Sequence, residues 1–178
     1  MVKNIFIGGI LFLAAIMQVS LFSNFFPMSL APDMVMLVII IWTIKSDFNI
    51  VLKWAILGGF FSDMLLFWPV GASIFSFVAV AFITNSLGKR FLVSQVAWKY
   101  LIFAMIVAVA TVLNYIVILT SMKILTNQEI LSRGIFSYTE LLFRKEMLLK
   151  ILYNLIMFAM IYWPLGKINK VFAYYNKK

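Results

Sequence analysis

The sequence predicts an all-α integral membrane protein, a bundle of six transmembrane helices with both termini in the cytoplasm. Three observations support this prediction. Of the 178 residues, 65% are hydrophobic, the mean hydropathy is +1.06 and only 12% are charged, about half the charged share of an average globular domain. The apolar residues form long runs. The cations lie in short clusters between them, so the net charge of +9 indicates membrane topology rather than nucleic-acid binding.

The composition also limits the chemistry. The chain has no cysteine and no histidine, which excludes disulfides, thiol catalysis, zinc or haem ligation through these residues, and histidine acid–base catalysis. The remaining carboxylates, hydroxyls, amides and cations form no recognisable catalytic set. We therefore expect a protein that is not an enzyme and that has no cofactor and no metal site.

The first predicted span follows Lys3 and is apolar over residues 5–22. A secretory signal peptide is the rival interpretation, which the length of the run, the lack of an A-x-A-like cleavage site and the spans that follow all disfavour. Pro27 and Pro32 then prevent one continuous helix. Pro32 suits the first position of the next helix, with Asp33 in its first turn. The eleven residues 34–44 rise only about 16 Å, roughly half of a hydrocarbon core.

The later spans are separated by polar or turn-forming segments. A polar turn covers residues 45–53, Pro69-Val70-Gly71 forms a hairpin turn, and Trp163-Pro164 lies near the end of the last span. Residues 123–147 form the one long loop, which we place outside the cytoplasm. The predicted spans, all in a single domain of residues 1–178, are 5–22, 33–44, 54–68, 72–87, 100–122 and 148–165.

The lysines and arginines set the orientation. With six crossings and a cytoplasmic N-terminus, ten of them lie in cytoplasmic segments and four outside, and Lys150 lies within the membrane. If residues 34–44 did not cross, the count would become five inside and nine outside, against the positive-inside rule. The short second span is therefore expected to cross.

The chain is organised around the stretch from Gly58 to Gly71. Asp63 places a carboxylate in an apolar helix, where a charge normally faces protein or water. Gly58 and Gly59 lie about one turn earlier and allow another helix to approach closely. Trp68 prefers the membrane interface, so Asp63 is expected just inside the bilayer.

The long loop carries its own helical signals. Thr126 to Glu129 fits a capping box and predicts a short helix over 127–133. A second box at Ser137 to Glu140 precedes two favourable i,i+4 pairs, Glu140 with Arg144 and Glu146 with Lys150.

The outer polar residues allow two interpretations. They form a cleft that binds a ligand or a partner helix, or they have a structural role in which Asp63 pairs with Lys150 or Arg144 and Asp33 caps the second helix. The mid-membrane residues Gln18, Thr111 and Asn114 are expected to form hydrogen bonds between helices. The candidate residues for partner binding or structure are Asp33, Gly58, Gly59, Asp63, Pro69, Gly71, Glu140, Arg144 and Lys150.

Three segments in order carry a family resemblance. Pro32-Asp33 leads into the apolar run 34–42, Gly59 to Asp63 follows, and Pro69-Val70-Gly71 opens the next helix. With the chain length, six spans and basic tail, this pattern resembles MreD, the small membrane subunit of the bacterial rod-shape system.

The resemblance implies a non-catalytic scaffold in the bacterial inner membrane that serves peptidoglycan synthesis during elongation. Implied partners are an MreC-like bitopic protein, a RodA-type glycosyltransferase with its class B penicillin-binding protein, MreB, and membrane lipid. The MreC-like partner is expected to bind the outer ends of helices two, three and six with the loop 123–147. The implied fold resembles the substrate-binding subunits of energy-coupling-factor transporters.

That fold likeness supplies the main alternative function, a vitamin-binding subunit whose pocket would use Trp68, Asp33, Asp63 and Tyr138. Such a subunit also needs a cytoplasmic face of small residues on its first helix, of which Ala14-Ala15 is only a fragment. A third possibility is a channel or exchanger that uses Asp63, but no other ionisable residue lies on a plausible path across the membrane.

Overall fold

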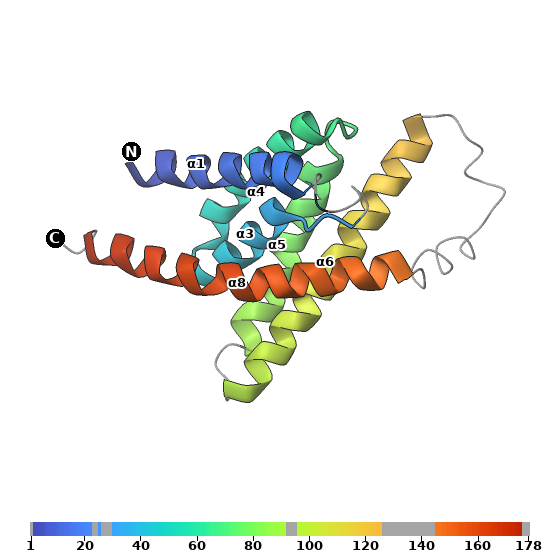
Figure 1. Ribbon diagram of the computed structural model, residues 1–178. Coiled ribbons are helices and arrows are strands. Elements are labelled where there is room, and N and C mark those ends of the chain that lie inside the picture. The colour runs from blue at the N-terminus through green and yellow to red at the C-terminus, as the bar shows by residue number, and fades with distance from the viewer. Residues whose placement is uncertain (1, 23–24, 26–29, 92–95, 126–144, 176–178) are drawn as a thin grey trace.

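Helices make up nearly all of the computed structural model, which describes residues 2–22, 25, 30–91, 96–125 and 145–175. The described part contains no strand, and the predicted all-helical fold is confirmed for it. Figure 1 shows the arrangement, with the first residue of the first helix and the last residue of the last helix on the same side of the view. The elements are α1 (Val2–Met17), the π-helical turn η1 (Gln18–Phe22), α3 (Met34–Lys45), α4 (Phe48–Leu66), α5 (Ala72–Phe91), α6 (Val96–Leu125) and α8 (Lys145–Tyr175).

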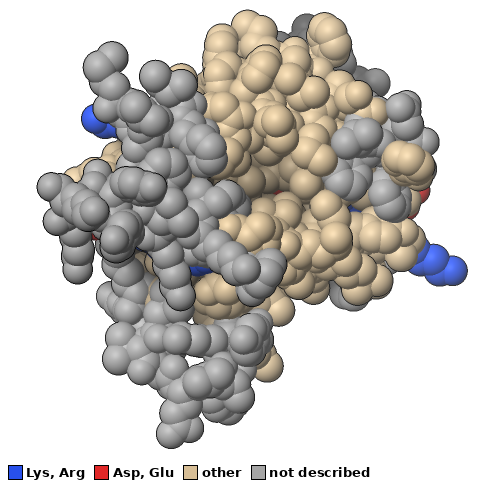
Figure 2. All heavy atoms as spheres, turned by 60° about the vertical axis from the view of Figure 1, so that its left-hand side comes forward, with Lys and Arg blue, Asp and Glu red and all other residues tan. Residues whose placement is uncertain are grey.

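The outer surfaces of these helices are apolar. Large apolar side chains recur at helical spacing along the exposed faces, and several polar side chains are buried, the reverse of the usual pattern in a soluble protein. In the face shown in Figure 2, most of the described atoms belong to uncharged residues. Examples of the exposed residues are Leu101, Met105 and Val109 on α6 and Leu148, Leu152, Ile156 and Met160 on α8.

Two helices in the described residues are long and apolar enough to cross a membrane, at Phe48–Leu66 and Leu101–Ser121. Three apolar segments are shorter, at Ile7–Ser20, Met34–Lys45 and Ala72–Gly88. A helix needs about 20 apolar residues to cross the hydrocarbon core unaided. The three shorter segments fall below that length.

The short helix α3 lies at the centre of the bundle. Every residue from Met34 to Thr43 is buried, and α3 contacts α1, α4, α5, α6 and α8. A helix that is apolar on all sides is stable only when it is surrounded. Its twelve residues span about 18 Å, and the neighbouring helices, rather than lipid, cover them.

The predicted turn between α4 and α5 is confirmed. Phe67 ends α4 in the left-handed conformation, with φ of 54°. The amide of Trp68 donates to the carbonyl of Asp63 at 3.0 Å, and the amide of Ala72 donates to the carbonyl of Pro69 at 3.0 Å. Gly71 has φ of 103°, which glycine adopts without steric cost.

The predicted polar turn is too long, and the last helix extends beyond its predicted span. The polar turn predicted over residues 45–53 ends at Asp47, because α4 already begins at Phe48. The last helix continues through Pro164 to Tyr175, well past the predicted end of the span at residue 165. Hydropathy locates the ends of the apolar runs. The helices extend further, because their backbone hydrogen bonds continue through the polar residues beside those runs. The short helix predicted at 127–133 and the Glu140–Arg144 pair lie outside the described residues.

Candidate functional site

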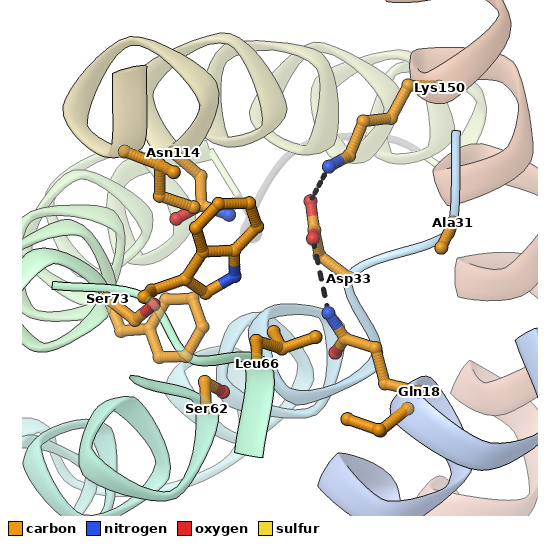
Figure 3. Close-up of a pocket in the computed structure, with 12 residues that line it drawn as sticks. Gln18, Ala31, Asp33, Ser62, Leu66, Ser73, Asn114 and Lys150 are labelled. Atoms are coloured by element: carbon orange, nitrogen blue, oxygen red, sulfur yellow. Dashed lines mark hydrogen bonds and ion pairs between the residues drawn. The ribbon is translucent and has the colours of Figure 1, made fainter. Parts of the chain in front are cut away.

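A buried carboxylate lies where the chain enters α3. The Oδ2 atom of Asp33 is 3.2 Å from Nζ of Lys150 on α8, and the two side chains are 7% and 9% exposed. Gln18 Nε2 donates a long hydrogen bond of 3.5 Å to Asp33 Oδ1. Figure 3 shows both side chains directed at the Asp33 carboxylate. We call Gln18, Asp33 and Lys150, with Thr111 and Asn154 described next, the Asp33 cluster.

Asn154, on the same helix as Lys150, extends this cluster to α6. Its Oδ1 accepts the backbone N–H of Asp33 at 2.8 Å. Its Nδ2 donates to Thr111 Oγ1 on α6 at 2.9 Å, and the Thr111 hydroxyl donates to the carbonyl of Val107 at 2.8 Å. Sequence reasoning identified Thr111 but missed Asn154, which is fully buried. The sequence signal that could have identified Asn154 is its i,i+4 spacing from Lys150, which puts both side chains on one face of α8.

The Asp33 cluster satisfies a buried backbone N–H as well as a buried charge. Residues 31–33 are not helical, and Ala31 and Asp33 are buried. A free N–H in an apolar interior costs several kcal/mol, and Asn154 accepts this one. The carboxylate and the ammonium compensate each other, because either charge buried alone would be strongly unfavourable.

Asp63 has a different role. Its Oδ2 accepts the N–H of Gly71 at 2.7 Å and its Oδ1 accepts the N–H of Ser73 at 2.9 Å. These amides lie at the N-terminus of α5, where N–H groups have no partner within the helix and the helix dipole favours an anion. Asp63 is 1% exposed. A carboxylate near the end of α4 therefore caps the following helix and fixes the turn between them.

The predicted pairing of Asp63 with Lys150 is wrong, and so is the expectation that Asp33 caps the second helix. Asp33 precedes α3 but makes no side-chain capping hydrogen bond; its carboxylate pairs with Lys150. Both oxygens of Asp63 are already bound by amides eight and ten residues away. The alternative partner, Arg144, lies outside the described residues.

The predicted close packing at the two glycines is confirmed. A Cβ atom at Gly59 would lie 2.5 Å from the Cα and 2.6 Å from the N of Ile74, so the backbones of α4 and α5 almost touch there. A Cβ atom at Gly58 would meet side chains instead, the nearest being Val35 Cγ1 at 3.0 Å. The two glycines bring α4 against α5 and α3 respectively.

A small cavity of about 30 Å³ separates the Asp33 cluster from the α4–α5 turn. Figure 3 shows the side chains around it, which come from several elements distant in sequence. No group of three or more histidine, cysteine, aspartate or glutamate residues that could hold a metal ion occurs in the described part of the chain. The polar residues that line the cavity are Gln18, Asp33, Ser62, Ser73, Asn114 and Lys150, together with the indole of Trp68.

Comparison with protein families matches residues 2–168 to MreD, described as rod shape-determining protein MreD. The chain belongs to the MreD family. The predicted resemblance is thus confirmed, and with it a role in rod shape determination and the membrane character of the chain. Comparisons with curated proteins and with solved structures return no match.

In this MreD protein the three segments that carried the resemblance meet in space. Asp33 follows Pro32, Ser62 precedes Asp63, and Ser73 follows the Pro69–Gly71 turn; all three side chains line the same cavity. Asp63 links the second segment to the third through the amide of Gly71. The proposed roles of Pro69, Gly71, Glu140 and Arg144 in binding a partner stay predictions.

Proposed function

We propose that this MreD protein is a non-catalytic, six-span scaffold of the bacterial inner membrane that binds an MreC-like bitopic partner in the cell-elongation complex. A RodA-type glycosyltransferase, its class B penicillin-binding protein and MreB join the same assembly, directly or through that partner. The single observation that supports this most is membership of a rod shape-determining family over residues 2–168.

The use of the buried polar groups supports a structural role. Asp33, Lys150 and Asn154 join α3, α6 and α8, and Asp63 caps α5. A general acid or base must be free to exchange a proton with a substrate. These side chains are instead committed to contacts that hold helices together.

The α4–α5 turn supplies a surface for the partner. Phe67 is 89% exposed and Val70 is 69% exposed, while the Asp63 carboxylate accepts the amide of Gly71 in the same turn. An open groove of about 380 Å³ lies beside the turn, between α5 and α6, and Val117 and Ser121 of α6 line its far side. Residues 126–144, which carry Glu140 and Arg144, follow directly after α6. We assign the membrane-proximal segment of the MreC-like partner to this groove and to the outer ends of α3, α4 and α8.

The vitamin-carrier alternative is less well supported. Small-molecule pockets usually enclose about 300–1,000 Å³, whereas the polar cavity holds about 30 Å³. Trp68 and Asp33 line it as that alternative requires, but the Asp63 carboxylate is bound to backbone amides. Tyr138 lies outside the described residues. A vitamin or an ATPase module that co-purifies with the protein would favour the carrier.

Site-specific photocrosslinking tests the scaffold. A photoreactive amino acid replaces Val70 at the turn or, as a matched control, Phe82 on α5, which is 61% exposed and outside the groove. Each variant is co-expressed with the MreC-like protein of the same bacterium. We expect a crosslink to that protein from position 70 and none from position 82.

Two results would contradict the proposal. Equal crosslinking from both positions would mean that the contact is not specific to the turn. Failure of the MreC-like protein to co-purify with the unmodified chain would remove the scaffold role itself.

A further inference from the structure

We propose that the cavity beside the Asp33 cluster is a built binding site for ordered water, which joins the buried ion pair to the α4–α5 hairpin. Its occupant is about two water molecules, held by side chains of α4, α6, α8 and the segment before α3. This proposal does not depend on the scaffold function, because it concerns the interior of the bundle rather than its partner surface.

Two residues that line the cavity carry buried polar atoms without a partner in the described part of the chain. Ser62 Oγ and Asn114 Oδ1 are fully buried and have no hydrogen-bond partner among the described residues. Both residues are 2% exposed and both line the cavity. An unmade hydrogen bond at a buried polar group is destabilising. Two such groups facing one space indicate a ligand that can both donate and accept.

The size of the cavity suits water. A site needs about 10–15 Å³ of space accessible to a water-sized sphere for each water molecule, and this cavity offers about 30 Å³. That is room for about two water molecules and too little for a sugar, a nucleotide or a lipid headgroup. Empty cavities in proteins are apolar, whereas this one is lined by hydroxyl, amide and charged groups.

The charges and hydrogen-bonding groups of the cavity wall also suit water. The one carboxylate and the one ammonium in the wall form an ion pair, so the site has no net charge to attract an ion. The Lys150 ammonium has three N–H donors, more than the contact with Asp33 requires. Lys150 donates to water, Asn114 Oδ1 accepts from it, and Ser62 does either. Water therefore satisfies groups that no neighbouring side chain reaches.

Hydration explains how the ion pair is tolerated. A buried pair is stabilised only when further hydrogen bonds satisfy its remaining donors and acceptors. Water at this site supplies them to Lys150 and Asp33. It also links these two residues to Ser62 of α4, which lines the same cavity.

Radiolytic footprinting of the purified full-length protein tests this. A short X-ray pulse in H₂¹⁸O converts water into hydroxyl radicals, which label the side chains beside it. Phe77 lines the cavity and is 3% exposed. Phe103 is equally buried, at 5%, but packs against the rings of Phe158 and Tyr162. We expect several-fold more ¹⁸O labelling at Phe77 than at Phe103.

Variants on one helix sharpen the test. Asn114→Leu replaces the cavity acceptor with an apolar group and should lower labelling of Phe77 to the level of Phe103. Thr120→Val, also on α6, removes a hydroxyl that bonds the carbonyl of Ile116 in its own helix and lies outside the cavity wall. It should leave labelling of Phe77 unchanged.

Three results would overturn the proposal: equal labelling of Phe77 and Phe103 in the natural protein, unchanged labelling of Phe77 in Asn114→Leu, or loss of it in Thr120→Val. If Asn114→Leu does not fold, Ser62→Ala replaces it, because it removes the other polar group of the cavity wall that has no partner among the described residues, and it should likewise lower labelling of Phe77.

Discussion

Two buried aspartates in this chain meet the same electrostatic problem with different partners. Asp33 has its ionic partner 117 residues away in the sequence, at Lys150 of α8. Asp63 uses backbone amides eight and ten residues away. A carboxylate satisfied by local amides needs no cation, whereas one without a local cap needs a counter-charge. The residue type is the same, and the neighbouring backbone decides the role.

A double-mutant cycle tests this assignment. Asp33→Asn and Lys150→Met should each lower the free energy of unfolding by roughly 3–5 kcal/mol, because each leaves one buried charge uncompensated. Their combination should cost less than the sum, with a coupling energy of about 1–3 kcal/mol. Reversible unfolding of the purified protein in mixed micelles measures all three values.

The matched control is the cycle of Asp63→Asn with Lys150→Met. These residues share no hydrogen bond or ion pair in the structure, so their effects should add to within about 0.5 kcal/mol. Coupling in this second cycle, with none in the first, would restore the pairing of Asp63 with Lys150 and refute the assignment made here.

At the scale of elements, close backbone approach sets the architecture. α4 meets the start of α5 at Gly59, where the adjacent atoms belong to the backbone of Ile74 and cannot rotate away. The same hairpin is fastened by Asp63 four residues later. The position of α5 thus depends on the missing side chain at Gly59 and on the hydrogen bonds of the Asp63 carboxylate.

A glycine comparison follows from this. Gly59→Ala should lower stability by at least about 1–3 kcal/mol, since the new methyl group overlaps backbone atoms. Gly9→Ala on α1 should raise stability by roughly 0.5–1 kcal/mol, because nothing lies within 4 Å of the new Cβ atom and alanine favours a helix. Thermal unfolding of the two purified variants, monitored by circular dichroism, measures both. A Gly59→Ala protein as stable as Gly9→Ala would mean that α4 and α5 are not in close contact.

At the scale of the whole molecule, the bundle is arranged for lipid outside and polar contacts inside. The central helix α3 can be short, because five neighbouring helices rather than lipid surround it. The length of α3 therefore does not need to match the thickness of the hydrocarbon core. The order of crossings proposed above places the turn at residues 69–71 outside and the turn at residues 46–47 in the cytoplasm.

Cysteine labelling tests this order cleanly, because the natural chain has no cysteine. In intact cells, or in spheroplasts if an outer membrane is present, Val70→Cys should react with a membrane-impermeant maleimide, and Asp47→Cys should react only after the membrane is opened. Both positions are exposed, so burial does not protect either one. Reaction of both from the same side would contradict a single crossing by α4.

The sequence by itself determined the helical class, the family, the α4–α5 turn and the two glycine contacts. These follow from composition, from residue order and from interactions between close neighbours in the chain. Only the tertiary structure decided which acid pairs with Lys150, that the side chain of Asn154 accepts the backbone N–H of Asp33, and that α3 lies at the centre of the bundle. Several polar residues lay near one predicted membrane face, and sequence spacing could not tell which of them touch. Contacts between distant segments depend on how the helices cross, and that is set by packing over the whole bundle.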